Sequence, residues 1–303
     1  MPSPHYDLIA IDLDGTLLNS RGVISDGNMR ALKRATDAGV RISVCTGRGF
    51  NECKHYTAQI GHTEPVVVAG GAILSHASTG RTIHRFPMNP GLVRRLVESL
   101  TAHGHAALVL KDPAGEEESG LQPDHDYLIV SPRGEEAIDP ISRWWFKEHR
   151  IGYHVVPSLD EDEHPGHTVR VGVCGTRGRT KAAADELQRD FASEVVFHHF
   201  GAVVPGDDKK PVDDQIVILE AFDKSVNKWA AITWLAQRRE VDPARIAAIG
   251  NDINDIAMLR GAALGVAMGN AIPEARVAAK RHTLGNDEDG VAHAIDRILK
   301  GEW

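Results

Sequence analysis

Short apolar runs alternate with helical segments at both ends of this 303-residue chain. Near the start, strand-like runs at residues 6–11, 40–45 and 66–69 are separated by segments with helical spacing. The first helix is expected over residues 28–38, with Asp26 as its N-cap. Strands that alternate with helices along a chain form parallel sheets through βαβ units. The sequence therefore predicts an α/β fold.

The middle third has a different pattern and predicts a separate α+β domain. Its expected helices are residues 92–103, 138–149 and 181–193, and its expected strands are residues 106–110, 168–174 and 195–198. Acidic, glycine-rich residues 111–126 are expected to form an exposed loop, and turn-rich residues 206–214 a linker or hairpin tip. We therefore expect one α/β domain built from residues 1–88 and 221–303, with residues 89–220 inserted as a smaller domain.

Composition excludes several classes of protein. The chain has 42 acidic and 34 basic residues, and its net charge of −8 argues against broad binding to nucleic acid or anionic membranes. No apolar run approaches the ~20 residues of a membrane span, and the start lacks the basic region of a signal peptide. Cys45, Cys53 and Cys174 show no CxxC spacing. We expect a reduced, cytoplasmic protein, and its oligomeric state stays open.

Two carboxylates directly follow the first predicted strand, in the run Asp12-Leu13-Asp14-Gly15-Thr16. Positions i and i+2 of a strand share a face, so Asp12 and Asp14 project together where the strand ends. Because two such acids repel, one tends to hold a proton while the other stays ionised. That division suits a nucleophile and a general acid/base, and a magnesium ion would resolve the same conflict by its charge. An Asx-turn is the structural alternative.

Two further groups could hold a phosphate. Thr46, Gly47 and Arg48 follow the second strand, where a hydroxyl and free backbone N–H groups can bind phosphate oxygens. Lys228 stands where a helix is expected to start, and its charge adds to the helix N-terminus. Alone, Thr46 could be a simple N-cap and Lys228 a surface lysine.

The fourth group is polar and follows the apolar run 245–249. Four polar side chains lie within five positions, although a helix start needs only one N-cap: Asn251, Asp252, Asn254 and Asp255. This density of carboxylates and carboxamides suggests a magnesium site. Ligands of open α/β sheets bind at the carboxyl ends of the strands, so these groups should meet at one sheet edge. Their joint chemistry indicates magnesium-assisted phosphoryl transfer.

At this point the sequence resembles the haloacid dehalogenase superfamily, and more narrowly the Cof-type sugar phosphatases. The matching stretches, in family order, are IDLDGTLL, CTGR, SVNKW, IGNDINDIAML and GVAMGNA. The resemblance covers the chain at both ends and matches the middle third only in position and size. It implies a Rossmann-like parallel-sheet core with an inserted α+β cap domain, and Mg²⁺ as the cofactor.

The resemblance also implies roles for individual residues. Asp12 would attack phosphorus and become a phosphoaspartate, and Asp14 would protonate the leaving oxygen and then activate water. Thr46 and Lys228 would hold the phosphoryl oxygens. The residues expected to flank the phosphate or the substrate are Gly47, Arg48 and Asn254.

The metal motif departs from the family pattern, because Asn251 follows the strand-ending glycine where an aspartate is usual. The expected metal ligands are Asp12, the backbone carbonyl of Asp14, Asn251 and, in support, Asp255. Asn251 should point back over the sheet edge, whereas Asp252 should begin a helix and favour its dipole. If Asp252 is the ligand instead, the motif is shifted by one residue.

We therefore hypothesise that the protein is a magnesium-dependent phosphatase. Its substrate, and its expected binding partner, would be a small phosphorylated metabolite, namely a sugar phosphate. A phosphomutase on the same scaffold and a non-enzymatic binding module are the alternatives. Residues 89–220 would select the substrate, and no motif in them identifies it.

Overall fold

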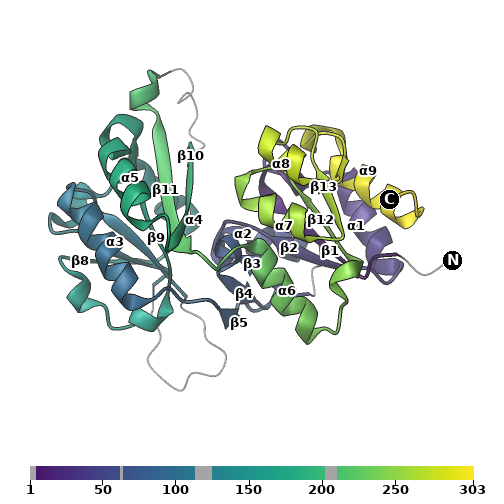
Figure 1. The fold of residues 1–303 in the computed structure, drawn as a ribbon, viewed down its shortest axis with the longest axis horizontal. Coiled ribbons are helices and arrows are strands. Elements are labelled where there is room, and N and C mark those ends of the chain that lie inside the picture. Colours follow the sequence, from purple (N-terminus) through teal and green to yellow (C-terminus); the bar gives the residue numbers. More distant parts are fainter. Residues whose placement is uncertain (1–4, 62–63, 113–124, 202–209) are drawn as a thin grey trace. The chain divides into compact units, whose positions relative to one another are not determined.

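The computed structural model describes residues 5–61, 64–112, 125–201 and 210–303 (Figure 1). They form two compact units, one from residues 1–83 with 227–303 and the other from residues 84–226. Most of the expected loop 111–126 and the beginning of the turn-rich stretch 206–214 lie outside the described residues.

An eight-stranded sheet in the order β14-β13-β12-β1-β2-β3-β4-β5 forms the centre of the first unit. Its strands are β1 (Leu8–Asp12), β2 (Arg41–Cys45), β3 (Val66–Val68), β4 (Ile73–Ser75), β5 (Thr82–Arg85), β12 (Ile246–Gly250), β13 (Leu264–Ala267) and β14 (Arg281–His282). The six strands from β14 to β3 are parallel, and β4 is antiparallel to β3. The α/β prediction is confirmed.

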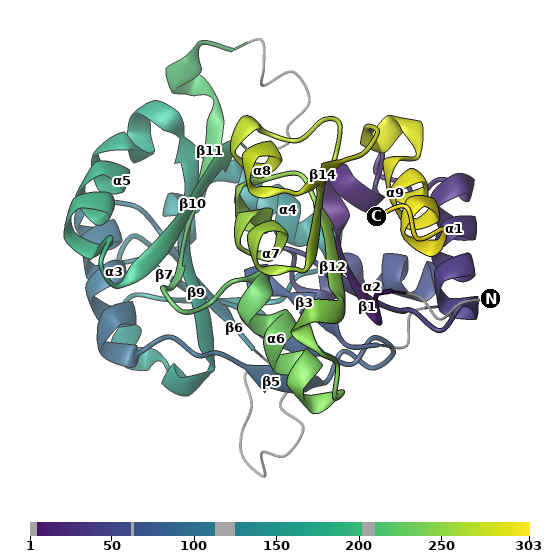
Figure 2. The same ribbon diagram turned by 45° about the vertical axis from the view of Figure 1, so that its right-hand side comes forward.

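Helices cover both faces of this sheet. They are α1 (Asp26–Asp37), α2 (Phe50–Gln59), α6 (Lys228–Arg238), α7 (Ile256–Gly261), α8 (Pro273–Ala278) and α9 (Gly290–Leu299). Figure 2 shows α1 and α9 on one side of the sheet and α6 and α7 on the other. Because helices cover both faces of the sheet, every residue of β1 is buried. Strands that are buried on both faces have nearly continuous apolar sequences, as residues 8–11 do.

The start of α1 differs from the prediction by one residue. Ser25, not Asp26, is the N-cap: its backbone is extended and its hydroxyl accepts a hydrogen bond from the Asn28 N–H. Asp26 is already the first helical residue, where its charge favours the helix dipole.

The second unit is built on a six-stranded sheet in the order β10-β11-β9-β6-β7-β8. Its strands are β6 (Ala107–Lys111), β7 (Tyr127–Val130), β8 (Tyr153–Val156), β9 (Thr168–Thr176), β10 (Val195–Gly201) and β11 (Ile216–Asp223). Its helices are α3 (Pro90–Ala102), α4 (Pro140–His149) and α5 (Arg177–Phe191). The sheet is antiparallel except for the parallel pair β7 and β8. Side chains from α3 and α5 share its main apolar core.

The two units divide next to the expected boundaries but not at them. The division falls inside β5, between Ile83 and His84, and between Val226 and Asn227. The second boundary shifts because β11 runs without a break to Asp223, which pairs with the first residue of β10. Among the residues in the four described ranges, no helix is long and apolar enough to cross a membrane.

A buried asparagine ties three segments of the first unit together. The Asn28 Oδ1 accepts a hydrogen bond from the Ala292 N–H at 2.9 Å, and its Nδ2 donates to the Leu17 carbonyl. We predict that Asn28→Ala lowers the free energy of unfolding by ~1–3 kcal/mol, because it leaves buried polar groups unpaired. Urea unfolding measures this, with the exposed Gln237→Ala as a control that changes stability by less than ~0.5 kcal/mol. Equal effects of the two changes would contradict the prediction.

Candidate active site

The parallel register brings three polar segments to one edge of the first sheet. Asp12 ends β1 opposite Cys45 of β2, and the preceding Ile11 lies opposite Ile249 of β12. Thr46 therefore follows the strand on one side of Asp12, and Asn251 follows the strand on the other. The expected meeting of residues from both ends of the chain is present in this unit.

A buried lysine joins two carboxylates at this edge. The Lys228 Nζ donates to Asp12 Oδ1 at 2.5 Å and to Asp255 Oδ1 at 2.7 Å, and its side chain is fully buried. Lys228 is the first residue of α6, whose N-cap Asn227 accepts a hydrogen bond from the Ala230 N–H. The lysine is thus held by the start of a helix and is not a surface residue.

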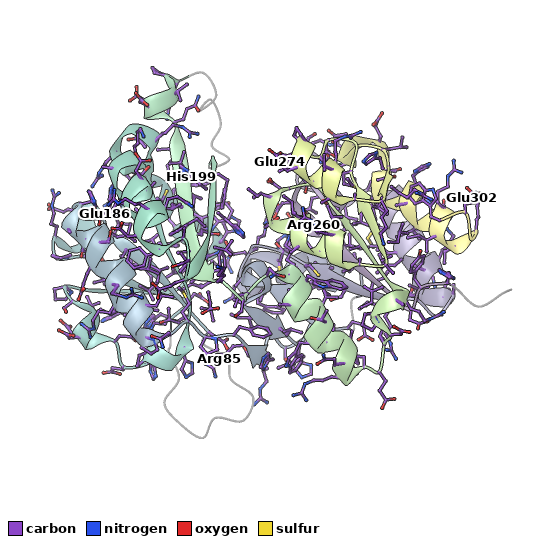
Figure 3. The ribbon with its side chains drawn as sticks, in the orientation of Figure 1. Arg85, Glu186, His199, Arg260, Glu274 and Glu302 are labelled. Carbon is purple, nitrogen blue, oxygen red and sulfur yellow. The ribbon has the colours of Figure 1, made fainter. Side chains whose placement is uncertain are left out.

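Burial and the neighbouring charges shift the pKa values of Asp12 and Lys228. Desolvation, together with the nearby Asp255 carboxylate, raises the pKa of Asp12 to about 7, against the opposing charge of Lys228. Burial alone would lower the pKa of Lys228, but its two carboxylate partners raise it well above its usual value. The exposed charges of Arg260, Glu274 and Glu302 lie instead on the outside of this unit (Figure 3).

The second oxygen of Asp255 shapes the turn that carries Asn251. Asp255 Oδ2 accepts hydrogen bonds from the backbone N–H groups of Asn251 and Asp252, at 2.8 and 3.0 Å. Asp252 is exposed, and its carboxylate accepts from the Ile253 N–H at the start of a short 3₁₀ turn, Ile253–Asp255. The Asp252 side chain therefore serves as a cap.

Oxygen atoms converge on the carboxamide of Asn251. One terminal atom of this group lies 3.0 Å from the Asp14 carbonyl oxygen and 3.2 Å from Asp12 Oδ2. If that atom is nitrogen, it donates hydrogen bonds to both oxygens; if it is oxygen, three oxygens face one another. The Thr16 hydroxyl lies 2.9 Å from the same atom and satisfies either orientation.

This donor set has the chemistry that magnesium requires. A carboxylate, a backbone carbonyl and a carboxamide are the hard oxygen ligands that Mg²⁺ prefers. Within the described parts of the chain, no group of three His, Cys, Asp or Glu side chains is arranged to hold a metal ion. The oxygen atoms around the Asn251 carboxamide include only one side-chain carboxylate, that of Asp12. The Asp14 carbonyl and the Asn251 carboxamide would therefore have to supply the other protein ligands of a metal ion.

The CTGR segment contacts the site in a way that its sequence did not reveal. Thr46 is fully buried, and its Oγ1 accepts a hydrogen bond from the Arg48 N–H at 3.1 Å. The Arg48 guanidinium forms two hydrogen bonds to the Asp14 carboxylate. A side chain at Gly47 would place its Cβ 3.5 Å from the Asn254 amide, so Asn254 lies beside this turn.

Gly71 positions the start of α6, a role that its sequence did not reveal. Its φ is +107°, and a Cβ there would lie 2.3 Å from the backbone of Asn227 and 2.7 Å from the Lys228 N. Only glycine lets the turn after β3 approach the start of α6 this closely. The signal in the sequence was the Gly70-Gly71 pair directly after the third predicted strand, at residues 66–69.

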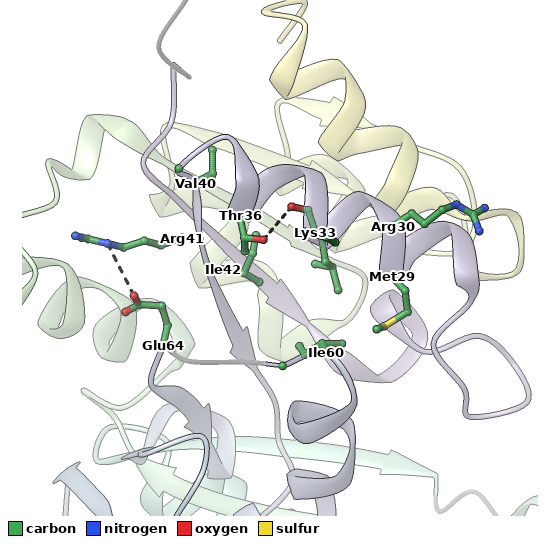
Figure 4. A pocket seen from close by; sticks show the side chains of 12 residues that line it. Met29, Arg30, Lys33, Thr36, Val40, Arg41, Ile42, Ile60 and Glu64 are labelled. Atoms are coloured by element: carbon green, nitrogen blue, oxygen red, sulfur yellow. Dashed lines mark hydrogen bonds and ion pairs between the residues drawn. The ribbon is translucent and has the colours of Figure 1, made fainter. Parts of the chain in front are cut away.

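A separate cavity of about 530 Å³ lies at the other end of β2 (Figure 4). It is bordered by α1, the beginning of β2 and the end of α2, and an Arg41–Glu64 ion pair lies at its side. Because Arg41 begins β2 and Cys45 ends it, this cavity is not part of the site around Asp12.

Comparison with known proteins shows the family to which the chain belongs. Residues 9–295 match the family model of the haloacid dehalogenase-like hydrolases, so the chain belongs to that family. It is 29% identical over 301 residues to the Bacillus subtilis 5-amino-6-(5-phospho-D-ribitylamino)uracil phosphatase YwtE, covering 97% of this chain and 99% of the relative. It is 25% identical to the Escherichia coli pyridoxal phosphate phosphatase YbhA, covering 95% and 97%. The resemblance inferred from the motifs is confirmed.

The fold is also shared with solved structures. A haloacid dehalogenase-like hydrolase from Bacteroides thetaiotaomicron superimposes with a TM-score of 0.73, at 23% identity, over 97% of this chain and 99% of that one. The two relatives named above match nearly the whole of this chain and are named phosphatases, which supports the conclusion that this chain is a hydrolase.

The buried lysine generates a prediction about stability. Lys228→Met leaves the Asp12 and Asp255 carboxylates buried together without their cation, and should lower the free energy of unfolding by ~3–5 kcal/mol. Urea unfolding in a chelating buffer measures this, with the exposed Lys300→Met as the matched control. Adding Asp12→Asn should recover part of the loss, because one buried charge is then removed. If the losses of stability in Lys228→Met and Asp12→Asn simply add in the double variant, the two groups are not coupled, and the prediction is wrong.

Proposed function

We propose that this protein is a magnesium-dependent phosphatase that hydrolyses a small phosphorylated metabolite, a sugar phosphate, through a phosphoaspartate on Asp12. The observation that carries the proposal is the buried contact of Asp12 with Lys228 at a sheet edge, with Asp14 two residues further on. The names of the two curated relatives, which act on phosphorylated ribityl and pyridoxal compounds, support a small phosphorylated substrate.

In the first half of the reaction, a carboxylate oxygen of Asp12 attacks phosphorus and the ester P–O bond breaks. The leaving oxygen takes its proton from Asp14, because an alcohol leaves far more readily than an alkoxide. In the second half, Asp14 accepts a proton from water as the water oxygen attacks phosphorus. The acyl phosphate bond then breaks, which restores Asp12 and releases inorganic phosphate.

The phosphoryl group is held by residues that surround Asp12. Lys228 supplies a permanent positive charge, since its raised pKa keeps it protonated at any working pH. Thr46 and the backbone of Gly47 follow β2 directly beside Asp12 and supply hydrogen-bond donors. Asn254, beside Gly47, is proposed to lie near the leaving group.

Asp12, the Asp14 carbonyl and Asn251 are the proposed ligands of Mg²⁺. When bound there, magnesium neutralises charge on the carboxylate and the phosphoryl oxygens. Asp255 supports the site indirectly, because one of its oxygens is taken by Lys228 and the other by two backbone N–H groups.

The inserted unit, residues 84–226, is proposed to be the cap that selects the substrate. It lies in the chain between Thr46 and Lys228, and its last residue, Val226, is followed directly by Asn227 and Lys228 at the start of α6. It also has its own sheet and core, and can therefore vary without disturbing the catalytic residues.

Phosphate release from a panel of sugar phosphates, with and without magnesium, tests the proposed activity. A phosphatase releases inorganic phosphate only with the metal. A phosphomutase would move the phosphate on the substrate without net release, and a binding module would do neither.

The two aspartates generate the most direct prediction. Asp12→Asn should abolish turnover and keep the native melting curve, because a carboxamide of the same shape cannot form an acyl phosphate. Asp14→Asn should lower kcat by ~10²–10⁴-fold, the usual loss for a general acid/base. Steady-state kinetics on purified variants measure both effects. Substantial residual turnover in Asp12→Asn, or less than a tenfold loss in Asp14→Asn, would contradict the assignments.

Asn251 generates a prediction about metal affinity. Asn251→Asp should lower the magnesium concentration required for half-maximal activity, because it adds a charged oxygen, and Asn251→Ala should raise it. Asp252→Ala should leave it nearly unchanged and cost only ~0.3–1 kcal/mol of stability as a lost helix-terminal charge. Magnesium titrations of the three variants decide the matter. A sharp increase with Asp252→Ala but not with Asn251→Ala would show that the motif is shifted by one residue.

A further inference from the structure

We propose that Arg48 is a positioning residue for Asp14, and not a ligand of the substrate phosphate. This inference rests on the proposed function, in which Asp14 transfers protons. It assigns the guanidinium to the protein's own carboxylate, whereas the family resemblance placed Arg48 beside the phosphate.

The contact between the two side chains is bidentate. Arg48 Nε donates to Asp14 Oδ2 at 2.9 Å, and Arg48 Nη2 donates to Asp14 Oδ1 at 2.6 Å. Two parallel hydrogen bonds of this kind fix the plane of the carboxylate as well as its distance. A single lysine ammonium could not impose that orientation.

Arg48 is itself held at several points. Its backbone N–H donates to Thr46 Oγ1, and its carbonyl accepts from the Ala69 N–H at 2.8 Å. Its Nη1 donates to the Glu52 carbonyl, and its guanidinium lies 5.6 Å from the centre of the Tyr56 ring. The anchor is therefore fixed to β2, α2 and the turn after β3.

Asp14 needs such an anchor because its side chain is otherwise open to solvent. The Asp14 side chain is 52% exposed, against 19% for Arg48. The next residue, Gly15, has a φ of +70°, so Asp14 stands in an irregular turn and not in a rigid strand. Its carbonyl faces Asn251 while its carboxylate faces Arg48, and the fork of Arg48 selects one rotamer for the carboxylate.

The two cations of the site are thus divided between the two acids. Lys228 pairs with Asp12 and Asp255, and Arg48 pairs with Asp14. A guanidinium committed to Asp14 through both of its facing nitrogens acts on the substrate only through that carboxylate. Loss of Arg48 should therefore impair proton transfer and leave phosphate binding intact.

Leaving-group dependence separates these two roles. A phosphate ligand contributes equally to every phosphomonoester, whereas proton donation matters only for a poor leaving group. The value of kcat/KM is measured for an alkyl phosphate and for p-nitrophenyl phosphate, whose leaving group needs no proton. This parameter covers only the steps up to departure of the leaving group, so later hydrolysis of the phosphoaspartate does not affect the comparison.

Arg48→Gln should lower kcat/KM for the alkyl phosphate by about 10²-fold, the scale of a misplaced catalytic group, and for p-nitrophenyl phosphate by less than about threefold. Arg48→Lys should not restore the alkyl phosphate activity. In an Asp14→Asn background, Arg48→Gln should have little further effect, because its target is already gone. The exposed Arg260→Gln is the matched control, and melting curves verify that each variant is folded.

Equal losses on both substrates, full rescue by Arg48→Lys, or losses that multiply in the double variant would each overturn the inference. The proposed function fails in a different way. If Asp14→Asn itself shows no selectivity for the poor leaving group, then Asp14 is not the acid. If Asp14→Asn is selective and Arg48→Gln is not, the acid assignment stands and only the role of Arg48 is wrong.

Discussion

The buried ammonium of Lys228 is the interaction on which the rest of the site depends. Two carboxylates, Asp12 and Asp255, lie in the core of the first unit, where an unpaired charge is costly. With the cation between them, Asp12 can be buried beside the strand ends, and Asp255 can order the turn that carries Asn251. Gly71 makes the same contact possible, because its lack of a side chain lets the start of α6, which carries Lys228, approach the turn after β3.

A second cation, Arg48, pairs with the second aspartate of the turn, Asp14. Arg48 orders an exposed acid, and Lys228 orders a buried one, so the two aspartates of one short turn have different surroundings. Asp12 is buried, which fits its proposed role as a nucleophile, whereas half of the Asp14 side chain is exposed, which fits its proposed exchange of protons with water. This contrast arises from local structure alone: β1 ends at Asp12, and the irregular turn after it carries Asp14 outward.

Much of this could be predicted from the sequence, because parallel strands and their polar ends leave strong local patterns. Asp12, Thr46 and Asn251 were placed at one edge from their positions after apolar runs, and the strand register agrees. The partner of Arg48 was not predictable, because a long side chain after a strand can reach several neighbours. β11 was also missed, since its apolar residues do not alternate clearly with polar ones, and the boundary of the inserted unit moved with it.

The order of strands has a consequence for synthesis of the chain. β1 lies between β2 and β12, yet more than two hundred residues separate it from the latter. As the chain leaves the ribosome, the inserted unit is complete before β12 exists, and it can close its sheet from a continuous stretch. Until then β1 has one open edge, and Asp12 stays in water. The candidate site around Asp12 therefore cannot assemble on the nascent chain until Lys228, Asn251 and Asp255 have been made.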